Sequence, residues 1–304
     1  MIKGGAVLKK NELAPNHFIA EGVLVFVTIL WSTTFILVQR AITPQYWKGA
    51  SFTPNSLITY RFTISAIALF LWKPKIIQQI KKIELRAGIL LGALLYVAFL
   101  TQTIGLQYTT TTKSGFITAL SIIFIPFLSI AIEKKIPPLG SIVGTFLALT
   151  GLYLLLNPFA EQSAINRGDI MTLICAVTWG FYIVLLSYYT TRGIQILPFV
   201  FVQFVAMAVL CWIYFAAAGE RIILPEFQLA AIVIFLGLFC TLLTTLLQNQ
   251  YQKFTTSTRA ALIYSAEPLL VAILGYLILN EQMTIPQILG GILIVAGVIC
   301  SELF

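Results

Sequence analysis

The sequence predicts an all-α polytopic membrane protein whose ten transmembrane helices form two inverted five-helix repeats. Three observations lead to this fold class: the apolar composition, the number of long apolar segments, and the similarity of the two halves. Of 304 residues, 59% are hydrophobic and 10% are charged, whereas roughly 25% are charged in a soluble domain. The mean hydropathy of +0.94 argues against a water-soluble enzyme and against disorder, since neither tolerates so much apolar side chain.

The apolar segments are long enough to cross a bilayer, which requires about 20 residues. Their connections are short and carry Pro, Gly, Asn and charged residues, which are typical of loops. We expect the first segment to be retained, because it is too long for a signal-peptide core and no small-residue cleavage site follows it. The ten expected spans are 18–39, 55–72, 86–106, 114–132, 139–157, 169–190, 196–217, 228–250, 258–279 and 285–303.

The distribution of basic residues predicts the orientation. With the N-terminus in the cytoplasm, 13 of the 19 Lys and Arg residues fall in inside segments and 5 in outside segments, while Arg61 lies within a span. This asymmetry favours cytoplasmic N- and C-termini, and the short loops suit a bacterial cytoplasmic (inner) membrane. The net charge of +8 does not indicate nucleic-acid binding, because the basic residues form no continuous face.

The two halves, 1–157 and 158–304, resemble each other at a nearly constant offset of 146 to 148 residues. The segment 108–113 (YTTTTK) matches 254–259 (FTTSTR), and the matching single residues are Gln102 with Gln248, Trp31 with Trp179, and Glu133 with Glu281. Five spans per half is an odd number, so the second half must enter the membrane from the opposite side. Inverted repeats are typical of secondary transporters that open one central site alternately to either side.

The final third of the chain resembles the end of an EamA-type transporter of the drug/metabolite transporter superfamily. The resemblance rests on the segments 259–268 (RAALIYSAEP), 280–281 (NE) and 287–297 (QILGGILIVAG). The segments 30–35 (LWSTTF) and 60–62 (YRF) resemble the first-span and second-span motifs of the family. The resemblance implies ten helices in two inverted repeats around a central cavity. It also implies transport of small organic solutes, often amino acids or other metabolites and commonly outward.

Glu267 is the candidate for proton coupling. It lies near the middle of the ninth span, where a carboxylate is energetically expensive and suggests a functional site. Pro268 follows it and has no N–H, so the Tyr264 carbonyl loses its helical partner. The alternative is a kinked helix whose Glu is hydrogen-bonded to a neighbour. We expect helix kinks at Pro268 and at Pro126, the proline of the corresponding span in the first half, which has no acid beside it.

Arg61 is a deeply placed basic residue that cannot lose its proton and therefore needs a partner. It either holds a substrate carboxylate or, in the interpretation we favour, ties its helix to a carbonyl or to a carboxylate such as Glu267.

Polar and aromatic side chains near mid-depth are candidates for lining a substrate cavity, because aromatic rings suit an organic ligand and can hold a cation. The alternative for each aromatic is ordinary packing, and for each amide an interhelical hydrogen bond. Since the repeats are inverted, Gln102 and Gln248 would lie toward opposite membrane faces. The substrate-binding candidates are Trp31, Thr34, Tyr96, Gln102, Trp179, Tyr182, Thr245, Gln248, Tyr264 and Glu267.

These observations favour a secondary active transporter, not an enzyme, that moves a small organic metabolite such as an amino acid or amine by alternating access. We expect an exporter driven by a proton or substrate gradient. An uptake carrier or exchanger of the same fold is the alternative, and a membrane-embedded enzyme or a channel is a distant one. The expected partners are a small-molecule substrate and the lipid bilayer, with the chain a monomer or homodimer. No cofactor and no metal site are expected, because His17 is the lone histidine and the four cysteines show no paired spacing.

Overall fold

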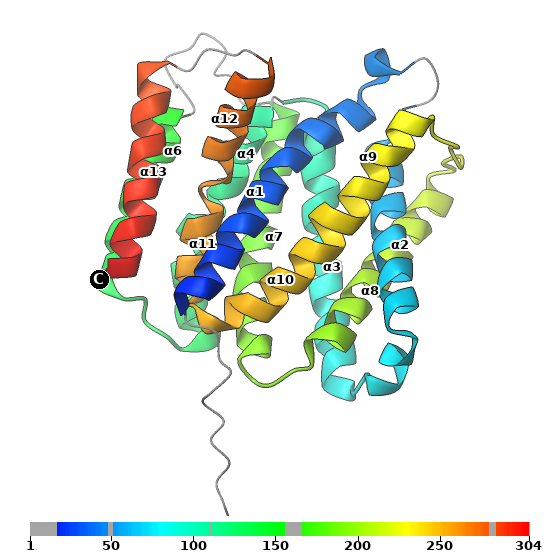
Figure 1. Ribbon diagram of the computed structural model, residues 1–304, viewed down its shortest axis with the longest axis horizontal. Coiled ribbons are helices and arrows are strands. Elements are labelled where there is room, and N and C mark those ends of the chain that lie inside the picture. Colours follow the sequence, from blue (N-terminus) through cyan, green and yellow to red (C-terminus); the bar gives the residue numbers. More distant parts are fainter. Residues whose placement is uncertain (1–16, 48–50, 110, 156–165, 280–283, 304) are drawn as a thin grey trace, which may run out of the picture.

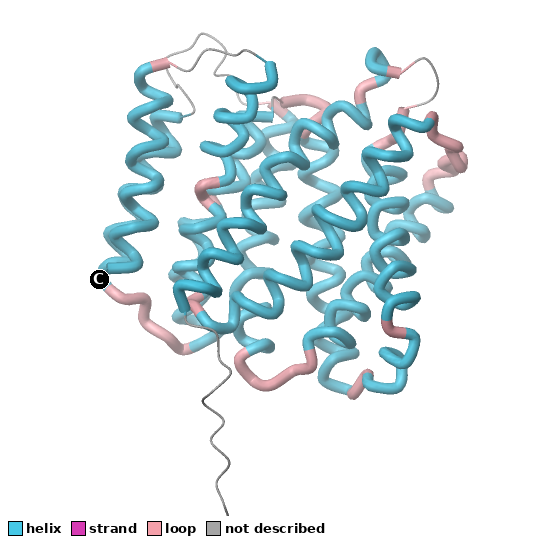
Figure 2. The backbone as a smooth tube through the Cα atoms, viewed as in Figure 1, coloured by secondary structure: helices cyan, strands magenta, loops and turns pink. Residues whose placement is uncertain are grey.

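In the computed structural model, the chain forms a bundle of helices that run between two ends, with most turns gathered at those ends (Figures 1 and 2). The structure describes residues 17–47, 51–109, 111–155, 166–279 and 284–303, and within these ranges it contains helices and turns but no strand.

The helices of the first half are α1 (His17–Ile42), η1 (Pro44–Tyr46), α2 (Pro54–Trp72), η2 (Pro74–Gln79), α3 (Lys82–Gly105), α4 (Thr111–Ala119), α5 (Ser121–Leu128), η3 (Ser129–Glu133) and α6 (Leu139–Leu155). Those of the second half are α7 (Arg167–Thr190), α8 (Ile196–Ala217), α9 (Phe227–Gly237), η4 (Leu238–Leu243), α10 (Thr244–Tyr251), η5 (Gln252–Phe254), α11 (Ser257–Tyr264), α12 (Glu267–Leu279) and α13 (Ile285–Leu303).

The start of α7 is set by a local sequence signal. The Asn166 side chain accepts a hydrogen bond from the Asp169 N–H, and the Asp169 carboxylate accepts one from the Asn166 N–H. This reciprocal capping satisfies two N–H groups that would otherwise lack partners in the first turn. It also fixes the Asp169 carboxylate at the helix end, where it is available to neighbouring helices.

Seven helical segments are long and apolar enough to cross a membrane: His17–Ile42, Lys82–Gly105, Lys113–Glu133, Arg167–Thr190, Ile196–Ala217, Phe227–Phe254 and Ser257–Leu274. Two shorter apolar helices are Leu139–Leu154 and Ile285–Ser301. The protein is therefore an integral membrane protein, while the count of ten spans stays a prediction.

The side chains are distributed as a lipid environment requires. Large apolar residues such as Leu71, Phe127 and Phe146 are exposed, whereas Asn249 and Gln252 are completely buried. A water-soluble protein rarely exposes so large an apolar surface. In a lipid environment, exposed apolar side chains carry no free-energy cost. The polar side chains inside the bundle are therefore the candidates for function.

The helices α6 and α13 lie side by side at one edge of the bundle (Figure 1). A Cβ added at Gly144 would lie 2.4 Å from the Gly297 carbonyl oxygen, and one at Gly151 would lie 2.5 Å from that of Gly290. Only glycine allows the two backbones to approach so closely. The pair joins the last helix of the first half to the last helix of the second.

Two spans are interrupted, one of them directly before an expected proline. One break lies at Leu120, between α4 and α5, and the other at Ser265 and Ala266, between α11 and α12. Pro126 lies inside α5, six residues beyond the first break, and Pro268 is the second residue of α12. The break at Ser265 and Ala266 lies in the turn before Pro268, beside the Tyr264 carbonyl that the proline leaves without a helical partner.

Some sequence-based expectations fall elsewhere. His17 is the first residue of α1 and not part of a preceding tail. The boundary between 157 and 158, and the residues Asn280 and Glu281, lie outside the described residues.

Candidate functional site

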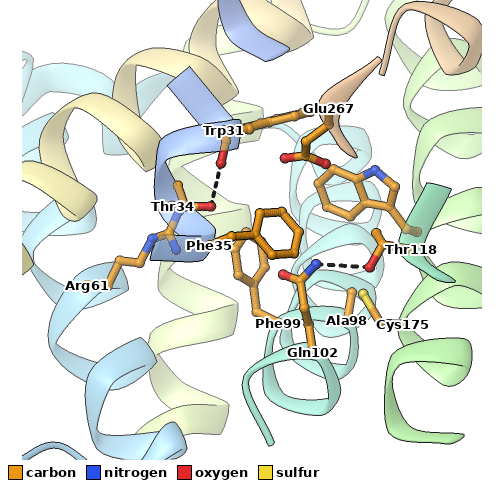
Figure 3. A pocket seen from close by; sticks show the side chains of 11 residues that line it. Trp31, Thr34, Phe35, Arg61, Ala98, Phe99, Gln102, Thr118, Cys175 and Glu267 are labelled. Carbon is orange, nitrogen blue, oxygen red and sulfur yellow. Dashed lines mark hydrogen bonds between the residues drawn. The ribbon is translucent and has the colours of Figure 1, made fainter. Parts of the chain in front are cut away.

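A cavity lies inside the bundle between α1, α2, α3, α4, α7 and α12 (Figure 3). The centre of a water-sized sphere can occupy about 30 Å³ of it, which is room for roughly two water molecules. An organic solute therefore requires the cavity to widen. Its walls are formed by Trp31, Thr34, Phe35, Arg61, Ala98, Phe99, Gln102, Thr118, Cys175, Trp179 and Glu267.

Glu267 supplies the carboxylate of this cavity. It is the first residue of α12, directly after the break at Ser265 and Ala266. Within the described part of the chain, its carboxylate has no hydrogen-bond or ion-pair partner. The N-terminus of α12 favours the negative charge. The carboxylate is thus held at the cavity without being neutralised by a basic side chain.

Arg61 reaches the cavity from α2 and is held by the opposite helix. Its Nε donates to the Thr241 hydroxyl, and one terminal nitrogen donates to the Cys240 carbonyl at 3.1 Å. Both acceptors lie in η4, a segment with π-helical geometry, which often occurs at functional sites. Among the described contacts Arg61 makes no ion pair with Glu267, and Figure 3 shows the two side chains on different sides of the cavity. Arg61 thus bonds to a backbone carbonyl, no tie to Glu267 is present among the described contacts, and its structural role stays a prediction.

The aromatic candidates form one connected group. The ring centroids of Trp31 and Trp179 are 5.4 Å apart in an edge-to-face arrangement, and Trp31 lies 5.2 Å from Tyr264. Trp179 stacks on Tyr182 at 5.1 Å with an interplanar angle of 18°. The guanidinium carbon of Arg61 lies 4.9 Å from the ring centroid of Phe99, which itself contacts Trp179. Aromatic faces therefore cover the wall between the acidic and the basic side chain.

A buried polar layer lies next to the two tryptophans, toward the end of the bundle where α1 begins. The Tyr182 hydroxyl donates to Gln203, whose amide donates to Asn249 at 3.1 Å. The Tyr264 hydroxyl donates to Gln252 at 3.2 Å, and the Gln252 amide donates to the Ile183 carbonyl. Because these groups satisfy one another, the layer closes this side of the cavity.

The structure brings together half of the predicted substrate-binding residues. Trp31, Thr34, Gln102, Trp179 and Glu267 line the cavity. Four others lie beside it in or near the polar layer: Tyr182, Thr245, Gln248 and Tyr264. The remaining candidate, Tyr96, is half-buried and is not part of the cavity wall.

Sequence reasoning did not single out several residues of the wall, among them Phe35, Phe99 and Cys175. Phe35 follows Thr34 directly, Phe99 precedes Gln102 by three residues, and Cys175 precedes Trp179 by four. Spacings of three and four place side chains on one helix face, so Phe99 and Cys175 were detectable from residues already chosen. The four cysteines are free thiols, and Cys175 is the one among them that borders the cavity.

The site combines a carboxylate, an anchored guanidinium and aromatic faces within one small space. Glu267 can hold an ammonium group or a proton, and the aromatic rings can hold a cation or an apolar group. Arg61 keeps N–H groups that the described contacts do not use, and these can bind a carboxylate. No paired carboxylates and no Ser/His pair occur among the residues of the wall.

Comparisons with known proteins agree with this architecture. A family model described as the EamA-like transporter family matches residues 19–157 and again residues 166–302. A protein of Archaeoglobus fulgidus named as an uncharacterized transporter is 28% identical over 284 residues, covering 92% of this chain and 84% of that protein. The uncharacterized transporter YcxC of Bacillus subtilis is 25% identical, covering 82% of this chain and 84% of its own.

A solved crystal structure shares the fold. It superposes with a TM-score of 0.73 at 18% sequence identity, and the match covers 94% of this chain and 98% of that one. The similarity therefore extends over the whole bundle and includes both halves.

Proposed function

The chain belongs to the EamA-like transporter family, and on that premise we propose that it is a secondary active transporter of a small organic metabolite. The solute class that suits the side chains of the cavity is an amino acid, an amine or a similar amine-bearing compound. The observation that carries the proposal is the half-buried Glu267 carboxylate, which lines the cavity together with Trp31 and Trp179 and has no partner within the described residues. An ammonium group of the solute or a proton would neutralise it in turn.

The proposed mechanism is alternating access in an exporter driven by a proton or substrate gradient. The family model matches the chain twice, which supports two repeats of five spans in opposite orientation, ten spans in all. Such repeats have two equivalent arrangements around a midplane site. In this arrangement the N- and C-termini lie in the cytoplasm, and the membrane is the bacterial inner membrane. The chain works as a monomer or homodimer.

The test is untargeted metabolite profiling of cells and medium. Cells that produce the wild type are compared with cells that produce Glu267→Gln and with cells that carry an empty vector. We expect one class of amine-bearing solute to leave the cells with the wild type alone. Accumulation of the solute inside the cells would mean that the protein takes the solute up and does not export it. An identical shift with both proteins would remove Glu267 from the mechanism, and the absence of any shift in cells supplied with amino acids and amines would contradict the proposal.

A second prediction concerns Trp179, whose ring borders the cavity and contacts Trp31, Phe99 and Tyr182. Trp179→Ala should weaken the binding of the solute found by profiling by about tenfold or more, as truncation of a central aromatic contact does. Binding is measured as the shift in unfolding temperature of purified protein with added solute.

The matched control for Trp179→Ala is Phe62→Ala. Phe62 is completely buried and packs on Phe99 and Phe204, but it is not part of the cavity wall. Its truncation should lower the unfolding temperature more than Trp179→Ala and weaken binding less. The reverse order would mean that Trp179 serves packing.

A further inference from the structure

We propose that two repeat-equivalent polar clusters, one at each end of the bundle, act as alternating gates of the cavity. The outer gate consists of Thr109, Lys113 and Asp169, and the inner gate of Glu21, Thr255 and Arg259. The inference rests on the proposed transport function, because gates that open in turn require a site that serves both sides. It goes beyond that function by naming the side chains that hold each end closed.

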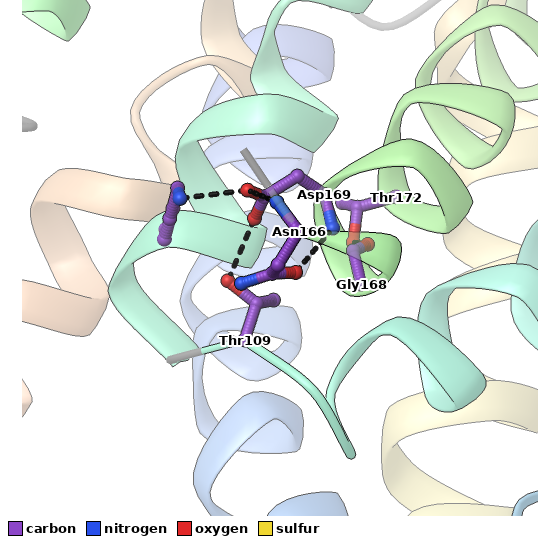
Figure 4. Close-up of polar contacts among 6 residues, drawn as sticks. Thr109, Asn166, Gly168, Asp169 and Thr172 are labelled. Atoms are coloured by element: carbon purple, nitrogen blue, oxygen red, sulfur yellow. Dashed lines mark hydrogen bonds and ion pairs between the residues drawn. The ribbon is translucent and has the colours of Figure 1, made fainter. Parts of the chain in front are cut away.

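The outer gate ties the start of α7 to the connection between α3 and α4 (Figure 4). The Lys113 ammonium lies 2.7 Å from one carboxylate oxygen of Asp169, and the Thr109 hydroxyl donates to the other oxygen at 2.9 Å. The side chains of Lys113 and Asp169 are 20% and 6% exposed. An ion pair this well shielded is screened little by salt and holds its partners more firmly than an exposed pair.

The inner gate repeats this arrangement with equivalent residues. Thr255 and Arg259 follow Thr109 and Lys113 by 146 residues, and Asp169 follows Glu21 by 148, the offset that also relates Trp31 to Trp179. The Thr255 hydroxyl donates to the Glu21 carboxylate at 2.8 Å, as that of Thr109 does to Asp169. Glu21 and Arg259 border the same surface hollow. The hydrogen bond from a threonine to a carboxylate is therefore present in both halves, although sequence analysis did not identify Glu21 or Asp169.

The outer gate lies on two helices that form the cavity wall. Asp169 precedes Cys175 by six residues on α7, and Lys113 precedes Thr118 by five on α4, distances of about 8–9 Å along each helix. Parting Lys113 from Asp169 thus lets α4 move away from α7 directly beside the cavity. Both gates are closed in the structure, which agrees with a cavity of about 30 Å³.

The inner end carries a second closure that also involves α11. The Glu133 carboxylate accepts hydrogen bonds from the hydroxyls of Ser129, Ser187 and Ser257. Ser257 lies two residues after Thr255, so α11 is held by α1 and by η3 together. Together with the buried polar layer, this makes the inner end the more firmly closed one. A single substitution should therefore open the outer gate more readily than the inner.

The test uses the native thiol of Cys175 as a reporter in the full-length protein. Cys211, Cys240 and Cys300 are replaced by Ala or Ser, so that a charged methanethiosulfonate, which does not cross membranes, reacts at Cys175 alone. Reactivity is measured from outside in intact cells and from the cytoplasmic side in inside-out vesicles. Asp169→Asn and Lys113→Gln should each raise the outside rate at least about fivefold. The reason is that removing ~1 kcal/mol of the free energy that favours the closed state raises the population of the open state by that factor. Glu21→Gln should raise the inside rate by a smaller factor.

A matched control separates gating from helix capping. Glu84 accepts a hydrogen bond from the Lys81 N–H at the start of α3, as Asp169 does from that of Asn166 on α7, but it belongs to neither gate. Glu84→Gln should leave both rates unchanged. Lys113→Gln breaks the ion pair without touching the α7 cap, so it should reproduce the effect of Asp169→Asn. Rates are compared only between variants that have the same unfolding temperature and are present in the membrane in the same amount.

The outcomes separate the gates from the transport function. Unchanged rates in both outer-gate variants, with the fold intact, would overturn the gates, while solute movement in the profiling would leave the transport function standing. Raised rates on the expected sides without any solute movement would support the gates and contradict the transport function. Equal increases from both sides would show general loosening and would also overturn the gates.

Discussion

Glu267→Gln is expected to lower transport at least tenfold, which corresponds to about 1.4 kcal/mol on one step of the cycle, and to abolish its response to a pH gradient. Glutamine keeps the shape of the side chain but cannot bind or release a proton. Among the described residues of the cavity wall, Glu267 alone carries a carboxylate. The measurement is flux of the identified solute in proteoliposomes, with and without an imposed pH gradient.

The control for this prediction is Glu84→Gln, the same chemical change at a carboxylate outside the cavity. It should lose at most a helix cap, which contributes about 0.5–2 kcal/mol to stability, and a hydrogen bond from the Gln195 N–H at the start of α8, and keep its pH response. If Glu267→Gln still responds fully to the pH gradient, proton coupling does not pass through this residue. If the flux falls but still responds to the pH gradient as in the wild type, Glu267 serves solute binding and not proton coupling.

Arg61→Met is expected to have the largest effect on stability. Its guanidinium joins α2 to η4 through the Thr241 hydroxyl and the Cys240 carbonyl, and it packs on Phe99. Methionine fills a similar volume without these hydrogen bonds. The loss should lower the free energy of unfolding by about 2–4 kcal/mol, given roughly 1.5–3 kcal/mol for each hydrogen bond to a charged group. Unfolding of the purified protein in detergent measures it.

Two comparisons sharpen the Arg61 prediction. Arg61→Lys keeps the charge but offers one terminal nitrogen in place of the planar fork, so its stability should fall between those of Arg and Met. Arg40→Met removes an exposed arginine at the end of α1 and should change stability by less than about 0.5 kcal/mol. If Arg61→Met unfolds like the wild type but no longer binds solute, Arg61 serves the substrate carboxylate and not the helix contact.

Membership in the membrane class and the candidate carboxylate could be predicted from the sequence. Apolar composition and run length do not depend on how helices pack, so the helical segments were placed close to their observed bounds. A carboxylate within a span is rare enough to be recognised without any contact. The expected depth alone therefore points to Glu267, and aromatic character near the same depth points to Trp31 and Trp179.

One of the two helix breaks lies away from the proline expected to cause it. Proline predicts a kink in each half, yet the first break lies at Leu120, six residues before Pro126. Proline removes an N–H wherever it stands, but whether a helix bends there depends on the neighbours that pack against it. The repeat indicates the break better than the proline does, because Leu120 and Ala266 are 146 residues apart.

The sequence by itself determined the class of the protein, the family motifs and the carboxylate at mid-depth. The tertiary structure decided that Arg61 bonds to η4 and not to Glu267, that Phe99 and Cys175 join the cavity wall, and that Tyr182 belongs to a polar layer beside it. It also decided that Asp169 meets Lys113. The physical reason is that hydropathy sets the depth of a residue in the membrane, whereas packing sets the rotation of each helix and so the partner of each side chain.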